Sequence, residues 1–282
     1  MIIVRIEGGL GNQLFQYALG KNLALINNTE LKLDLNYFKK SSFRTFELNH
    51  FNINEKEIIA QNIKYLKWAN SKNKLLNSLY NFFFTEPEIY KEKHFHFDNE
   101  VFKCKNESYL SGFWQSEKYF ISIKKQIQET LTFNPSFNHK FNNQIQQINN
   151  SESVALHVRR GDYLKNKNHL LLNLQYYEKA LDLLTEKLTN PEIFIFSDDI
   201  EWCKLNLDVK LPHQFMSRNE SHEDLKLMAL CKHFIIANST FSWWGAYLSK
   251  NLSKIVICPK NWFPEYSTNN SEDLFVEDWI LI

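Results

Sequence analysis

The sequence predicts an α/β protein built on parallel strands, and two observations support this. Between residues 154 and 258, short apolar runs typical of buried strands alternate with patterns typical of helices. At the amino terminus, an apolar strand from Ile2 to Ile6 runs into a glycine-rich turn that is followed by a helix. The chain has 282 residues, of which 44% are hydrophobic, so it can form one large domain or two of ordinary size.

Composition excludes several classes of protein. The formal net charge of +1 provides no overall field that would attract nucleic acid. The four cysteines lie far apart without a CxxC pair, so reduced thiols are expected rather than a zinc or redox site. The first residues lack the pattern of a signal peptide, and no apolar run approaches the roughly 20 residues of a membrane span.

The glycine-rich turn is predicted to span Glu7 to Gln13, with a helix carrying an apolar stripe from Leu14 to Ile26 after it. Two nucleotide motifs fail here. A dinucleotide fingerprint requires glycine where Leu14 stands, and a P-loop requires Ser or Thr where Asn22 follows Lys21. Two interpretations therefore remain, a tight turn with a structural role or a backbone that approaches a ligand.

The middle of the chain contains fewer signals. Trp114, just after a predicted strand, suits either a sugar platform or the core. We expect a connection between domains in the polar, Asn- and Gln-rich segment 134–153, which gives domains at 1–150 and 151–282. The other elements expected in this region are a strand at Leu31–Leu35, helix over much of 53–84, an edge strand that contains His94 and His96, and a strand at Ser108–Phe113.

The second half alternates clearly between strands and helices, which predicts a parallel sheet covered on both faces. A helix is expected to begin at Ser221, with Asp224 completing a capping box. The other expected elements are strands at Val154–Val158, Ile193–Phe196, Phe234–Ala237 and Lys254–Cys258, and a helix at Gln175–Leu188.

Polar residues follow three of these strands, at Arg159-Arg160, Ser197–Asp199 and Asn238–Ser242. In a parallel sheet these exits share one edge, so the residues can converge on one ligand. Two adjacent guanidiniums suit a diphosphate, because each planar fork can bind two oxygens. The structural alternatives are a surface ion pair for the arginines and simple helix capping for the Asp, Ser and Thr residues.

The run His157–Tyr163, HVRRGDY, resembles the HxRRxDY motif of the bacterial α-1,2-fucosyltransferases of glycosyltransferase family 11. Further stretches also resemble the family, namely GGLGNQLFQYA from Gly8, SGFWQSEKYF from Ser111, FSDD from Phe196 and NSTFSWWGAYL from Asn238. The resemblance implies a GT-B-like fold, in which two Rossmann-like domains face each other across a cleft. It places GDP-fucose mainly on the C-terminal domain, and the glycine-rich turn and the acceptor side on the N-terminal one.

The resemblance also implies an activity, the inverting transfer of L-fucose from GDP-β-L-fucose to the 2-hydroxyl of a galactoside in bacterial surface-glycan synthesis. No Asp-x-Asp motif is present, so the arginines rather than a metal are expected to stabilise the departing GDP. The alternatives are a fucosyltransferase of other regiochemistry and a non-catalytic carbohydrate-binding protein. We expect no cofactor, no nucleic-acid partner and a cytoplasmic location, with association with a membrane-borne lipid-linked acceptor left open.

The expected catalytic residues are His157, Arg159, Arg160 and Asp162. Asp162 is the candidate base, its alternative role is to orient an arginine, and His157 and Glu7 are the next candidates. No metal ligand is expected. The residues expected to bind the donor are Gly11, Asn12, Gln13, His157, Arg159, Arg160, Tyr163, Ser197, Asp198, Asn238, Ser239, Thr240 and Ser242.

Overall fold

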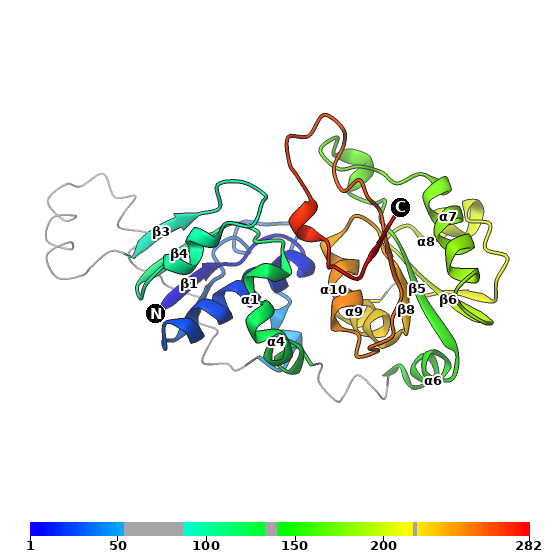
Figure 1. Ribbon diagram of the computed structural model, residues 1–282, viewed down its shortest axis with the longest axis horizontal. Helices are drawn as coiled ribbons and strands as arrows, with labels where there is room; N and C mark the ends of the chain where they lie inside the picture. Colours follow the sequence, from blue (N-terminus) through cyan, green and yellow to red (C-terminus); the bar gives the residue numbers. More distant parts are fainter. Residues whose placement is uncertain (54–86, 133–139, 217–218) are drawn as a thin grey trace, which may run out of the picture. The chain divides into compact units, whose positions relative to one another are not determined.

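A computed structural model describes residues 1–53, 87–132, 140–216 and 219–282 (Figure 1). The chain forms two compact units, Met1–Leu131 and Thr132–Ile282, each with its own sheet. The division therefore comes before the expected boundary at residue 150. Much of the segment predicted as a connection is helix α6, Asn142–Asn150, which contacts strand and helix of the second unit. A cleft between the units stays a prediction.

The first unit is built on a four-stranded parallel sheet in the order β2-β1-β4-β3. The predicted strands that begin at Ile2, Leu31 and Ser108 are confirmed, although all three are shorter than expected. The bounds are β1 Ile2–Arg5, α1 Leu10–Ile26, β2 Leu31–Asp34, β3 Glu88–Lys91, β4 Ser108–Ser111 and α4 Lys124–Thr130. The helix predicted over 53–84 lies almost entirely outside the described residues.

Helix α1 begins earlier than predicted, so the glycine-rich turn is shorter. Gly9 is the N-cap residue with an extended backbone, and Gly8 has a φ of +80°, a conformation that favours glycine. The first helical residue is therefore Leu10, directly after the N-cap residue Gly9, and Gly11 is accommodated in the first turn. As a result, Gly11, Asn12 and Gln13 lie in the helix rather than in a turn.

The edge strand predicted around His94 and His96 is wrong, because β3 ends at Lys91. The backbone N–H of Glu92 still donates to the carbonyl of Ser111, which is the last ladder contact. The Glu92 carboxylate then accepts hydrogen bonds from the backbone N–H groups of Phe113 and Trp114, which follow β4. A side chain thus takes the place of the ladder and ends the pairing.

The second unit contains a six-stranded sheet in the order β10-β9-β8-β5-β6-β7, and every neighbouring pair is parallel. This confirms the predicted parallel sheet. The strands are β5 Glu152–Val158, β6 Pro191–Ser197, β7 His213–Phe215, β8 His233–Ile235, β9 Val256–Cys258 and β10 Ile280–Leu281. The helices after α6 are α7 Leu174–Thr185, α8 Ile200–Asn206, α9 Ser221–Leu230 and α10 Thr240–Leu248.

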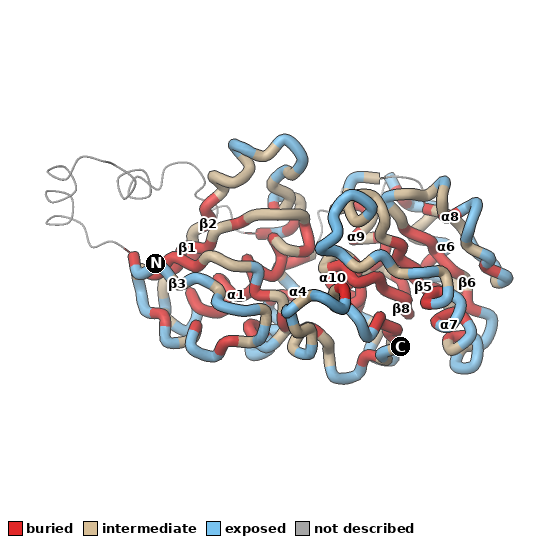
Figure 2. Tube along the Cα trace, turned by 90° about the horizontal axis from the view of Figure 1, so that it is seen from above, coloured by how far each residue is buried: buried red, intermediate tan, exposed pale blue. Residues whose placement is uncertain are grey.

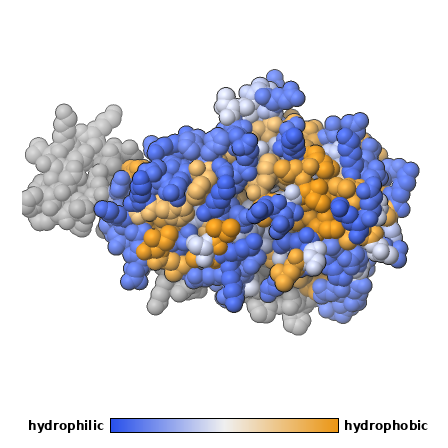
Figure 3. All heavy atoms as spheres, viewed as in Figure 1, coloured by the Kyte–Doolittle hydropathy of each residue, from blue (hydrophilic) through white to orange (hydrophobic). Residues whose placement is uncertain are grey.

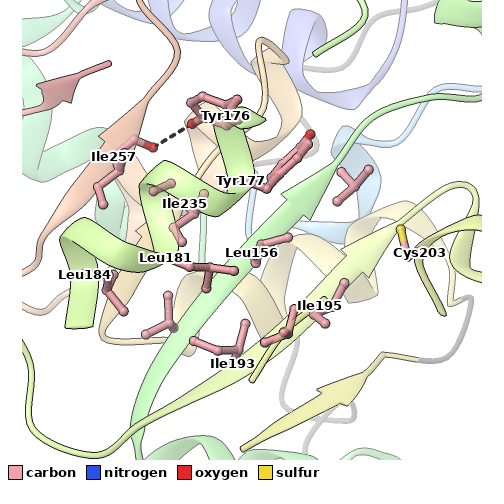
Figure 4. Close-up of a cluster of buried hydrophobic side chains, with 14 residues drawn as sticks. Leu156, Tyr176, Tyr177, Leu181, Leu184, Ile193, Ile195, Cys203, Ile235 and Ile257 are labelled. Atoms are coloured by element: carbon pink, nitrogen blue, oxygen red, sulfur yellow. Dashed lines mark hydrogen bonds between the residues drawn. The ribbon is translucent and has the colours of Figure 1, made fainter. Parts of the chain in front are cut away.

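Helices cover both faces of this sheet, with α7 and α8 on one side and α9 and α10 on the other (Figure 1). Figure 2 shows β5 and β8 as buried, in keeping with central strands of a covered parallel sheet. On the α7 side, Leu156 and Ile193 pack beneath Leu181 (Figure 4). The hydroxyl of Tyr176 donates to the carbonyls of Ile236, at 2.6 Å, and Ile257, at 3.3 Å, and so ties α7 to neighbouring strands.

The capping box of α9 is present, but it lies one position earlier than predicted. Glu220 is the N-cap residue, and its side chain and that of Glu223 reciprocally accept the backbone N–H groups. Asp224 instead accepts a 2.7 Å hydrogen bond from the side chain of Asn219, and burial raises its pKa to about 6. The Ser-x-x-Asp pattern therefore predicted the helix start with the wrong pair of residues.

The surface is mixed in character. On the face drawn in Figure 3, hydrophobic residues lie in groups among hydrophilic ones. None of the helices in the described ranges is long and apolar enough to cross a membrane.

Candidate functional site

The order of strands in the second sheet identifies where a ligand should bind. From β5 the chain continues to β6 and β7 on one side, and then returns to place β8 on the other side of β5. This reversal creates a topological switch point between the carboxyl ends of β5 and β8, and open α/β sheets bind ligands at such a point. The residues that follow β5 are Arg159 and Arg160, and Asn238 and Ser239 come shortly after β8.

Arg159 is held by two carboxylates. Its Nη2 lies 2.7 Å from Oδ1 of Asp162, and its Nη1 lies 2.9 Å from Oδ2 of Asp198. Asp198 also accepts the backbone N–H groups of Arg160, at 2.9 Å, and Gly161, at 3.1 Å. The exit of β6 therefore fixes the loop that follows β5, and Asp162 makes the orienting contact that the sequence left open as its alternative role.

Arg160 is fixed at one end and open at the other. Its Nε donates to Oδ2 of Asp199 at 3.2 Å, and its guanidinium carbon lies 3.7 Å from the centre of the Trp202 ring. A guanidinium has five N–H donors, so four remain on the two terminal amino groups. Those four have no hydrogen-bond partner among the described residues. Arg160 thus presents a rigid fork that can bind two oxygens of an anion.

His157 is buried at the end of β5, with 3% of its surface exposed. Its Nδ1 has no hydrogen-bond partner within the described part of the chain, and its ring lies 5.5 Å from that of Phe241 on α10. Burial first, and then the nearby charge of Arg159, lower the pKa of His157 from 6.5 to about 3. The ring is therefore neutral at ordinary pH and binds an additional proton only weakly, which disfavours it as a base.

This burial predicts a pH dependence of stability. Between pH 6.5 and about 3 the unfolded chain protonates His157 while the folded chain does not, so stability is lost as pH falls through this window. The loss approaches about 1.4 kcal/mol per pH unit. We expect His157→Gln to remove this slope of the free energy of unfolding against pH, which is determined from urea unfolding curves at pH 7, 5.5 and 4.5. His213→Gln, an exposed position in the same sheet, is the control. Equal slopes in wild type and His157→Gln would contradict the assignment.

Tyr163 and Asn238 hold the loop after the arginines. The hydroxyl of Tyr163 donates to the carbonyl of Asn238 at 2.8 Å, and burial raises its pKa to about 12. The amide of Asn238 donates to the carbonyls of Leu170, at 2.9 Å, and Trp262, at 3.0 Å. Its Oδ1 is buried and has no partner in the described part of the chain, so one polar atom remains available at this position.

The remaining second-unit candidates lie where the sequence predicts them, but their hydroxyls differ in availability. Ser239 is the N-cap residue of α10 and makes no side-chain cap, so its hydroxyl does not satisfy the N–H groups of the first turn. Thr240 opens the helix. Ser242 is buried, and its hydroxyl donates back to the carbonyls of Ala237 and Ser239. Ser197 accepts the backbone N–H of Asp199 at 2.9 Å.

The other candidates lie in the first unit. The amide of Gln13 is buried and fully engaged, since it donates to the carbonyls of Gly8 and Thr45 and accepts the N–H of Glu47. Gln13 therefore acts as a clamp on the loop at residues 45–47. Asn12 is half-buried and accepts from the side chain of Gln115 at 3.0 Å. Gly11 is buried within the helix.

The structure decides between the two interpretations of Trp114 and adds two residues to the arginine site. Trp114 is completely buried, so the core interpretation is confirmed and a sugar platform at this residue is wrong. The sequence placed Asp199 at the shared strand edge, with helix capping as its structural alternative, but did not indicate its contact with Arg160 or any part for Trp202. Asp199 is the N-cap residue of α8, where it contacts both Arg160 and the N–H of Trp202.

No group of three or more His, Cys, Asp or Glu side chains in the described ranges is arranged to hold a metal ion. The carboxylates nearest the site, Asp162, Asp198 and Asp199, are each engaged by an arginine. Metal independence nevertheless stays a prediction.

Comparison with known proteins gives matches along the whole chain. The sequence model of glycosyl transferase family 11 matches residues 1–282. An α-1,2-colitosyltransferase of Escherichia coli is 37% identical over 302 aligned positions, which cover 100% of this chain and 99% of that protein. The O-antigen biosynthesis glycosyltransferase WbnK of Escherichia coli is 33% identical and covers 98% of both chains.

Among solved structures, the crystal structure of the NodZ α-1,6-fucosyltransferase soaked with GDP-fucose superposes with a TM-score of 0.54 at 12% identity. The match covers 88% of this chain and 91% of that one. The two proteins therefore share their α/β fold.

Proposed function

The chain belongs to glycosyltransferase family 11, and we propose that it transfers L-fucose from GDP-β-L-fucose to the 2-hydroxyl of a galactoside with inversion. The observation that carries this proposal is the open guanidinium fork of Arg160 at the switch point between β5 and β8. A nucleoside diphosphate sugar has the two anionic phosphates that such a fork binds. The identity with an O-antigen glycosyltransferase favours an acceptor in a bacterial surface glycan.

In this mechanism the arginines act on the leaving group. The acceptor hydroxyl attacks the anomeric carbon and gives its proton to a base, the bond to the diphosphate breaks, and negative charge develops on GDP. Arg160 donates its terminal N–H groups to that charge, and stacking on Trp202 keeps the fork in place without reorganisation. Arg159 adds positive charge beside it, in the orientation that Asp162 and Asp198 impose.

The elements after β8 complete the donor site in this proposal. The first turn of α10 begins without a side-chain cap at Ser239, and helix N-termini attract phosphate. Neutral His157 provides a buried hydrogen-bonding atom, Nδ1, that has no partner among the described residues. Asp162 serves here as an orienting residue for Arg159 and not as the base.

A second donor also has specific support. Colitose is L-fucose without its 3-hydroxyl, and the 37% identical relative is named as a colitosyltransferase. The test is incubation of the full chain with lactose and either GDP-fucose or GDP-colitose, scored for GDP release and for product linkage. A 2-linked fucosyl-lactose supports the proposal. A preference for GDP-colitose would show that GDP-colitose, and not GDP-fucose, is the donor. GDP release without a glycosidic product, or no reaction with either donor, would refute it.

We expect transfer to persist in excess EDTA. The reason is that two guanidiniums at the β5 exit supply the charge stabilisation that a divalent cation provides in metal-dependent transferases. Initial rates with and without EDTA measure the effect, and readdition of Mg²⁺ or Mn²⁺ to the chelated enzyme is the control. Loss of activity in EDTA that is restored by either metal would refute the arginine account.

A further inference from the structure

We propose that Phe113 and Gln115, which follow β4 in the first unit, form the binding surface for the acceptor, a neutral β-galactoside. This inference rests on the proposed function and assigns its second substrate to particular residues. Phe113 is 38% exposed, whereas the neighbouring Trp114 is completely buried. The aromatic ring that a sugar can reach at this strand exit is therefore that of Phe113.

The segment that carries Phe113 is held rigidly. The two oxygens of Glu92 accept the backbone N–H groups of Phe113, at 2.7 Å, and Trp114, at 2.9 Å. The carbonyl of Gly112 accepts from the side chain of Gln16 at 3.1 Å. Trp114 has a φ of +58°, which a non-glycine residue adopts only where its surroundings impose it. Phe113 is thus presented by a fixed backbone.

The same contacts place Phe113 beside the glycine-rich end of β1. Gln16 on α1 accepts the backbone N–H of Glu7 at 2.9 Å with one end of its amide and donates to Gly112 with the other. The exits of β1 and β4, which are neighbouring parallel strands, are joined by this one side chain. The surface therefore lies at the carboxyl edge of the first sheet, where open α/β sheets bind ligands.

Gln115 supplies the polar part of the surface. Its Nε2 donates to Oδ1 of Asn12 at 3.0 Å, which fixes the orientation of the amide. The Oε1 of Gln115 has no hydrogen-bond partner among the described residues, so it can accept a hydrogen bond from a sugar hydroxyl. An exposed aromatic face with an oriented amide beside it matches a pyranose, which presents C–H groups on one face and hydroxyls at its rim.

The choice of galactose follows from the shape of that sugar. Its axial 4-hydroxyl leaves the C3, C4 and C5 hydrogens together on the opposite face, which forms an apolar surface for a ring such as that of Phe113. The two oxygens of Glu92 are already engaged by backbone N–H groups. The contacts offered to the sugar are therefore an aromatic face and a neutral amide, which suit an uncharged acceptor.

The test uses the full chain and measures binding of lactose apart from catalysis. Saturation-transfer NMR with lactose, with and without GDP, should give a signal for the wild type. Phe113→Ala should lower the affinity for lactose about tenfold, and Phe113→Trp should restore it. Gln115→Ala should weaken lactose binding, and Ile89→Ala, at an exposed site on β3, should not. In kinetics, Phe113→Ala should raise the KM for lactose and leave the KM for GDP-fucose unchanged.

Two results of the binding experiment would overturn the inference. One is wild-type affinity for lactose in Phe113→Ala, and the other is the absence of a lactose signal from wild type with GDP present. A protein that binds lactose through Phe113 but does not turn over GDP-fucose would refute the proposed donor and leave the acceptor surface standing. If the wild type makes fucosyl-lactose and Phe113→Ala leaves the KM for lactose unchanged, the acceptor surface is refuted and the proposed donor stands.

Discussion

Replacing Arg160 by alanine is expected to lower kcat about 100-fold or more, which would be the largest effect of any single substitution on activity. Groups that stabilise charge developing in a transition state typically contribute this much when one donor is removed. The loss should appear in kcat as well as in the KM for GDP-fucose, because charge on the departing diphosphate is greatest in the transition state.

Lysine at this position should rescue poorly. Arg160 uses its Nε for Asp199 and its planar face for Trp202 while the terminal amino groups remain open. An ammonium group is a point charge and cannot make the three contacts together. The matched control is Lys204→Ala, which breaks an exposed ion pair with Glu201 on the same helix, α8, and should leave the rate unchanged. Near wild-type kcat in Arg160→Lys would show that charge alone is sufficient.

Replacing Trp243 by alanine is expected to give the largest loss of stability in the second unit. The side chain is completely buried, lies stacked on Tyr247 with ring centres 4.7 Å apart, and packs against Trp279. Removing a buried Trp costs about 3–5 kcal/mol. Its Nε1 also donates to the carbonyl of Leu274 at 2.8 Å, so that carbonyl would lose its donor.

Thermal unfolding measures this effect, and a fall in Tm of roughly 6–20 °C is expected for a unit of this size. The Tm of Trp243→Phe should lie between those of the wild type and Trp243→Ala, because phenylalanine keeps an aromatic ring but lacks the N–H group. Leu252→Ala, at a fully exposed position shortly after α10, is the control and should leave the Tm unchanged. A fall of only a few degrees in Trp243→Ala would show that the cluster can collapse around the missing ring.

The sequence predicts the second sheet well because buried parallel strands are continuous apolar runs. Val154–Val158 and Ile193–Phe196 have no polar residue apart from His157, so their position and type follow directly from composition. Their exits could also be predicted, because parallel strands place their carboxyl ends on one edge. The pairing of Arg159 with Asp198 is a consequence of that arrangement.

Features that depend on side-chain direction could not be predicted in this way. The stacking of Trp202 on Arg160 requires the orientation of α8, which only tertiary packing fixes. The end of β3 depends on the carboxylate of Glu92, which accepts backbone N–H groups of the segment that follows β4. Helix α6 looked like a linker because just two aliphatic residues interrupt its polar sequence, and one of them, Ile148, is completely buried.

The reversal of strand order beside β5 also affects how the second unit folds. Glu152 at the start of β5 contacts His233 on β8, 81 residues later, at 2.6 Å. Strand β6 pairs with β5 after a much shorter excursion through α7, so loop-closure entropy favours that pairing first. The exit of β8, with Ser239 and the start of α10, joins the arginines only when the long-range pairing forms. Contacts so distant in sequence slow folding, so the proposed donor site should be among the last parts of the molecule to assemble.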